Sequence, residues 1–135
     1  MVSGAVTAVQ GGKLSEDIVV PVDRIGEAID ETLEIGRRHG LEACSWGHAG
    51  DGNLHSTFLL TPGDQEQLAL AELAAEELFD MAIALGGSVS GEHGIGWVKR
   101  GALARQWPPG AVGLHEAIKS SFDPAGLLNP GKKQA

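Results

Sequence analysis

The fold is decided by ten residues, 46–55, which read Trp-Gly-His-Ala-Gly-Asp-Gly-Asn-Leu-His. The Asp51-Gly52 pair is typical of a two-residue type I′ turn, because both central residues of that turn need positive φ. The flanking segments, 41–48 and 53–61, read as the two strands of an antiparallel hairpin. With this turn, His48 lies directly opposite His55, and the two Cβ atoms are about 4.5–5.5 Å apart.

A second cluster, residues 88–96, reads Ser-Val-Ser-Gly-Glu-His-Gly-Ile-Gly. If the two segments meet, Glu92 adds a carboxylate to the two imidazoles. Two histidines and one carboxylate, with a coordination position left open, form a common catalytic set for Zn²⁺ that also suits other divalent first-row ions. We therefore predict His48, His55 and Glu92 as metal ligands. The neighbouring His93 is the predicted general base, because imidazole titrates near neutral pH.

The same residues allow a simpler interpretation. Two histidines seven residues apart also fit a purely structural hairpin pair, and Asp51 is expected to form the turn rather than to bind metal. The remaining histidines, His39 and His115, are expected on helix surfaces.

Apolar spacing predicts helices over residues 24–39 and 65–85, and two shorter ones over 97–107 and 110–122. Strands are expected over 2–9 and 17–20, with a short strand or extended loop over 88–91. The resulting order is the split βαβ pattern. The predicted fold is therefore α+β and ferredoxin-like: an antiparallel sheet with helices on one face, followed by C-terminal helices.

Composition argues against a nucleic-acid-binding protein and against a membrane-spanning one. The net charge of the 135 residues is −8, and no basic cluster is present that would favour nucleic acid. No apolar run approaches the roughly 20 residues of a membrane span. Cys44 is the single cysteine, so no internal disulfide can form and a reducing, cytoplasmic location is expected.

Four stretches together resemble a known family: residues 13–21, 47–55, 86–96 followed by Lys99-Arg100, and 128–132, which reads Leu-Asn-Pro-Gly-Lys. They are similar to blocks of the C-terminal domain of FAD-linked oxidases. This family includes the glycolate oxidase flavin subunit, D-lactate dehydrogenase and D-2-hydroxyglutarate dehydrogenase. The resemblance covers nearly the whole chain in the family's order.

The resemblance implies oxidation of D-2-hydroxy acids to 2-oxo acids with FAD. It implies that His48, His55 and Glu92 hold a divalent metal, usually zinc, and that His93 removes the hydroxyl proton. Asn129 becomes a candidate flavin contact, although a plain turn is the other interpretation of its segment.

The family's N-terminal FAD-binding domain has no counterpart in these residues, so we expect one domain over 1–135 that is catalytically incomplete alone. Its expected partners are a small 2-hydroxy-acid substrate and an FAD-binding domain in cis or in trans, and several copies of the chain could associate. Two alternatives stay open: a standalone metal-dependent hydrolase, and a non-catalytic assembly module.

Overall fold

The structure, a computed structural model, describes residue 8 and residues 11–133. The chain divides into two compact units, Met1–Glu92 and His93–Ala135. Within the described residues, the first unit holds a three-stranded sheet and two long helices, and the second holds two further helices.

The sheet consists of β1 (Gly12–Val19), β2 (Ala43–His48) and β3 (Asn53–Leu60) in the order β1-β3-β2. The central strand β3 is antiparallel to both neighbours. Strands β1 and β2 are therefore parallel to each other but separated by β3, and α2 (Ile25–Arg38) connects them. This is the split βαβ arrangement, and the predicted α+β fold is confirmed.

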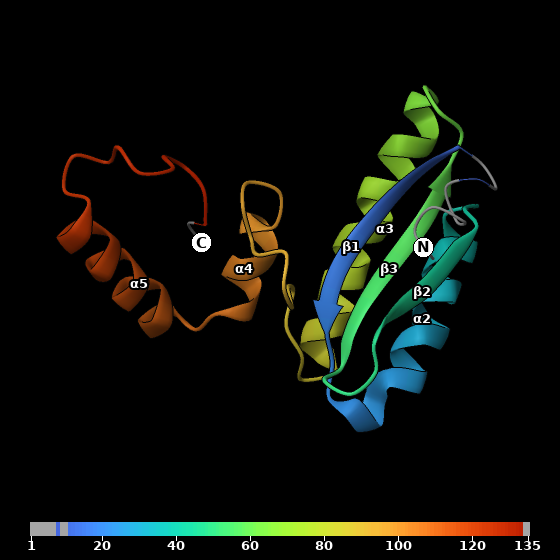
Figure 1. Ribbon diagram of the computed structural model, residues 1–135, viewed down its shortest axis with the longest axis horizontal. Coiled ribbons are helices and arrows are strands. Elements are labelled where there is room, and N and C mark those ends of the chain that lie inside the picture. The colour runs from blue at the N-terminus through green and yellow to red at the C-terminus, as the bar shows by residue number, and fades with distance from the viewer. Residues whose placement is uncertain (1–7, 9–10, 134–135) are drawn as a thin grey trace. The chain divides into compact units, whose positions relative to one another are not determined.

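Helices α2 and α3 (Gln65–Ala84) lie on the same side of the sheet (Figure 1). The covered face is identified by Thr32 on α2, whose hydroxyl lies 3.0 Å from the hydroxyl of Ser56 on β3. Asp64 directly precedes α3, and its carboxylate accepts hydrogen bonds from the backbone N–H groups of Glu66 and Gln67. This is N-terminal capping by an acceptor side chain.

The core lies between the sheet and these helices. Side chains alternate between the two faces of a strand, so alternate residues of β1 and β3 point toward the helices. The largest fully buried side chains there are Ile18, Phe58, Ile35, Leu78 and Phe79. The intervening strand residues, among them Asp17, Asn53, His55 and Thr57, point to the other face. That face therefore carries several polar side chains, including both predicted metal-binding histidines of the hairpin.

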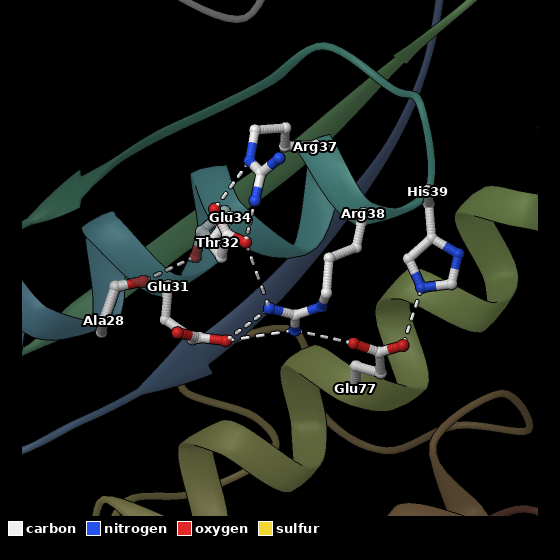
Figure 2. Close-up of polar contacts among 8 residues, drawn as sticks. All are labelled: Ala28, Glu31, Thr32, Glu34, Arg37, Arg38, His39 and Glu77. Carbon is white, nitrogen blue, oxygen red and sulfur yellow. Dashed lines mark hydrogen bonds and ion pairs between the residues drawn. The ribbon is translucent and has the colours of Figure 1, made fainter.

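A polar cluster joins α2 to α3 (Figure 2). The Arg38 guanidinium donates to Glu31 at 3.1 Å and to Glu77 at 2.8 Å. The His39 imidazole, which follows α2, lies 2.7 Å from the other Glu77 oxygen. One carboxylate of α3 is therefore held by two side chains from the C-terminal end of α2.

The second unit contains α4 (Arg100–Gln106) and α5 (Pro109–Phe122), which confirms both predicted C-terminal helices. The Arg100 guanidinium lies 3.9 Å from the ring centroid of Trp97 and donates to the Gly131 carbonyl at 2.9 Å. The backbone N–H of Lys133 donates to the Gly96 carbonyl at 2.8 Å. Residues 131–133 thus contact both the first residue of α4 and the loop that precedes it.

Two predicted strands differ from the structure or lie outside it. The strand expected over residues 2–9 lies outside the described residues, apart from Ala8. The strand expected over 17–20 is the end of a longer strand that begins at Gly12, because the whole of β1 pairs with β3. In the segment 88–91, Ser88 forms a single bridge with Val19.

Candidate metal centre

The predicted hairpin is present, but its register differs from the prediction. His48 pairs with Asn53, and His55 pairs with Trp46, so the strands are joined by a four-residue loop. The backbone N–H of Asp51 donates to the His48 carbonyl at 3.1 Å, which closes a turn over residues 48–51. Among the loop residues only Gly52 has positive φ, at 79°, whereas a type I′ turn needs two such residues. The expected two-residue turn is therefore wrong.

The shift in register keeps the two histidines together. Because side chains alternate with a period of two, a shift of one residue would have placed them on opposite faces. The actual shift is two residues, so His48 and His55 share a face as diagonal neighbours. Their ring centroids are 5.8 Å apart, and the ring planes are inclined at 81°.

The hairpin loop is anchored at Gly52. Its carbonyl accepts a hydrogen bond of 3.0 Å from the backbone N–H of Val20. A Cβ atom at position 52 would lie 2.0 Å from the Val20 carbonyl oxygen. A side chain is therefore excluded both by φ and by the close approach of the segment that follows β1.

Glu92 completes the cluster. One of its carboxylate oxygens lies 3.3 Å from Nε2 of His55 and 3.8 Å from Nε2 of His48. The three candidate ligand atoms all lie within 4.8 Å of one another. Ligands about 2.0–2.2 Å from a tetrahedral zinc ion are about 3.4 Å from each other. The donor atoms and their spacing therefore fit a divalent ion bound by two histidines and one carboxylate.

The cluster is open on one side. The His55 side chain is 13% exposed, while His48 and Glu92 are 60% and 50% exposed. A cation held by these three residues would contact one partly buried imidazole and two accessible ligands. Such an arrangement leaves a coordination position for a substrate or a water molecule.

The other two predicted site residues belong to the second unit. His93 directly follows Glu92 in the chain and is the first residue of that unit. Asn129 has positive φ of 48°, and its carbonyl accepts from the N–H of Lys132 at 3.2 Å, so its segment is a turn. Asn129 also lines a pocket of about 520 Å³ whose apolar wall includes Ile118 and Phe122.

Sequence reasoning missed Asp17 as a site residue. Its carboxylate is fully buried and accepts hydrogen bonds from Ser90, Gly91 and Glu92, the last of which is a predicted metal ligand. The available signal was an acidic residue directly before the apolar run Ile18-Val19-Val20 in a strand. A buried carboxylate needs hydrogen-bond donors, but the sequence does not say which ones.

Residues 1–133 match the family described as FAD linked oxidases, C-terminal domain. The chain belongs to this family. The FAD-linked oxidase family is a family of oxidoreductases. The motifs that suggested the resemblance and the cluster of His48, His55 and Glu92 therefore belong to a domain of this family. The stretches 47–55 and 86–96, which carry much of the resemblance, both lie within the match.

Curated relatives of this FAD-linked oxidase domain agree with the family match. The glycolate oxidase subunit GlcD of Bacillus subtilis is 37% identical over 117 residues, covering 87% of this chain and 25% of the relative. The D-lactate dehydrogenase of Archaeoglobus fulgidus is 39% identical over 116 residues, covering 86% of this chain and 25% of the relative. The GlcD subunit of Escherichia coli K12 is 32% identical over 126 residues, covering 90% of this chain and 25% of the relative. The chain thus spans about a quarter of the length of these relatives.

Within the described part of this FAD-linked oxidase domain, no helix is both long and apolar enough to span a membrane.

Proposed function

We propose that this chain is the substrate- and metal-binding part of an FAD-dependent oxidoreductase that converts D-2-hydroxy acids of the lactate, glycolate or 2-hydroxyglutarate type into 2-oxo acids. The family membership supports flavin-linked oxidation, and the relatives named glycolate oxidase subunit and D-lactate dehydrogenase suggest the substrate class. The observation that carries the proposal is the convergence of His48, His55 and Glu92 on one point.

The three residues of the cluster supply two kinds of ligand. His55 and His48 supply neutral nitrogen ligands, and Glu92 supplies the anionic one. A bound divalent cation, zinc in the proposal, would act as a Lewis acid that favours the anionic form of the substrate hydroxyl. The two exposed ligands leave room for a small 2-hydroxy acid to approach the open side.

His93 is the proposed proton acceptor. Its imidazole would take the hydroxyl proton of the substrate, since imidazole is suited to proton transfer near neutral pH. It directly follows Glu92 in the sequence, so the proposed base is the next residue after a proposed ligand. Bound FAD would supply the acceptor for the hydride that leaves the carbon bearing the hydroxyl group. Asn129 is a proposed contact for FAD.

We place the main FAD-binding surface on a separate domain, in cis or in trans. The second unit carries exposed large apolar residues, including Leu114, Phe122 and Leu127. Contiguous apolar exposure marks interaction surfaces. We infer that the FAD-binding domain covers this surface, which is also the observation that favours an assembly role for the chain. A cytoplasmic location stays a prediction from the single cysteine.

Metal binding is tested by titrating zinc into the 135-residue chain in a calorimeter. We expect one equivalent to bind, and we expect His55→Ala or Glu92→Ala to weaken the affinity by at least about tenfold. His115→Ala removes a histidine outside the cluster and is the matched control. Equal affinity in the wild type and in both cluster variants would refute the metal centre.

Turnover is tested with an artificial electron acceptor and D-lactate or glycolate. We expect no oxidation by the 135 residues alone, because the main flavin-binding surface is proposed to lie elsewhere. Robust turnover by this chain without an added FAD-binding domain would contradict that division of labour. Chelator-sensitive ester hydrolysis would instead support a metal-dependent hydrolase, which the same three ligands also fit.

A further inference from the structure

Asp17 lies on β1, on the same face of the sheet as the two histidines. In the strand register it is directly opposite His55. Its neighbour Ile18 points the other way, into the core, and both residues are fully buried. A carboxylate in this position is costly to bury unless donors surround it.

Three donors to Asp17 come from residues 90–92, the segment that ends at Glu92. One oxygen of Asp17, Oδ2, accepts from the hydroxyl of Ser90 at 2.9 Å and from the backbone N–H of Gly91 at 2.8 Å. The same oxygen accepts from the backbone N–H of Glu92 at 3.0 Å. Hydrogen bonds to an ionised acceptor are about twice as strong as neutral ones. Successive backbone N–H groups are a common way to hold an anion, and here the anion belongs to the chain itself.

The same segment lies directly on the sheet. Ser88 and Val19 exchange backbone hydrogen bonds of 2.8 and 2.9 Å. A Cβ atom at Gly91 would lie 2.7 Å from Nδ2 of Asn53 and 2.8 Å from a methyl carbon of Val19. Contacts with the sheet and with Asp17 thus hold the backbone from Ser88 to Glu92. The last of these contacts is at the N–H of Glu92, the residue whose side chain is the proposed ligand.

We propose that Asp17 is a positioning residue that holds the segment 90–92 so that the Glu92 carboxylate faces the imidazoles of His48 and His55. The role of this geometry in metal binding rests on the proposed function. All three donors meet the same carboxylate oxygen. An ionised carboxylate holds them more strongly than the neutral amide oxygen of an asparagine side chain would.

The test is a double-mutant cycle on zinc affinity, measured in the 135-residue chain. We expect Asp17→Asn to weaken zinc binding by about 10- to 100-fold, as changes to groups that orient ligands do. Asp23→Asn makes the same chemical change at an exposed position and is the control, expected to stay within about twofold. In a Glu92→Ala background, Asp17→Asn should add less than about twofold, because its effect passes through Glu92. Equal losses with and without Glu92 would overturn the proposal, since Asp17 would then act on the histidines or on the fold.

A second readout needs no metal. Amide hydrogen exchange at Gly91 and Glu92, followed by NMR, should be at least about tenfold faster in Asp17→Asn and unchanged in Asp23→Asn. If the wild type binds no zinc, the metal centre fails, while faster exchange at these two amides still supports the positioning role. Unchanged exchange overturns that role whatever the metal result. If Asp17→Asn does not fold, Ser90→Ala removes one donor and keeps the charge, and a several-fold increase in exchange is then expected.

Discussion

At the residue scale, Gly52 controls the geometry of the hairpin that carries both histidines. Its φ is 79°, and a Cβ atom at this position would lie 2.0 Å from the Val20 carbonyl oxygen, so both the backbone conformation and the close contact exclude a side chain. We expect Gly52→Ala to lower the free energy of unfolding by at least about 1–3 kcal/mol, the usual cost of a disfavoured backbone conformation. Urea denaturation measures this change.

Gly50 is the matched control in the same loop. It has no positive φ, and a Cβ atom there would meet nothing within 4 Å. Gly50→Ala is therefore expected to be neutral, or to stabilise the chain by up to about 1 kcal/mol through the unfolded state. Similar losses in both variants would show that the loop is sensitive to any side chain, and the specific role of Gly52 would be wrong.

The candidate ligands could be predicted from the sequence because their chemistry and order along the chain are visible in it. The hairpin register could not, since it depends on the turn over 48–51 and on the contact between Gly52 and Val20. Asp17 was missed for a related reason. Its partners lie 73 to 75 residues away, and two of them are backbone N–H groups, which every residue except proline carries.

At the element scale, Glu77 on α3 makes the polar contacts to Arg38 and His39 at the C-terminal end of α2. Hydrogen bonds from Arg38 first, and then from His39, hold the pKa of the Glu77 carboxyl below its usual value. A lowered carboxyl pKa stabilises the folded state at pH values above the ordinary glutamate pKa. This stabilisation is lost as the pH falls from that value through the lowered one.

We therefore expect Glu77→Gln to destabilise the chain at neutral pH and to match the wild type in acid. Glu77 is 43% exposed, so solvent screening limits the difference at neutral pH to about 1 kcal/mol or less. Thermal unfolding at a series of pH values measures it, with Glu72→Gln on the same helix as the control. A wild-type advantage that persists at the acid end would exclude this ion cluster as its source.

The order and type of the elements were predictable because α2 and α3 have long periodic apolar patterns and the hairpin has a marked turn. The start of β1 was not, since Gly12 and Lys13 join the strand only through their partners Leu60 and Leu59 on β3. Pairing between residues far apart in the sequence depends on the tertiary context and not on a local pattern. The limits of an edge strand such as β1 are therefore hard to predict from the sequence.

At the scale of the whole molecule, the second unit exposes several large apolar residues along α5 and the turn that follows it. Phe122 and Leu127 are 83% and 77% exposed, and Leu114 and Ile118 lie on the same face of α5 as Phe122 by their helical spacing. Scattered apolar residues are normal, but a contiguous group marks an interface. Under the proposed function, the FAD-binding domain would cover these residues.

Without that domain, copies of the chain should associate through the same residues. We expect sedimentation of the 135-residue chain to show concentration-dependent self-association, because burying apolar surface contributes about 25 cal/mol per Å². Phe122→Ser combined with Leu127→Ser should shift the chain toward monomer. Val22→Ser, at an exposed apolar residue of the first unit, should leave the association unchanged. If the double variant associates as strongly as the wild type, the exposed residues of α5 and the following turn are not the interface. The FAD-binding domain would then have to dock elsewhere on the chain.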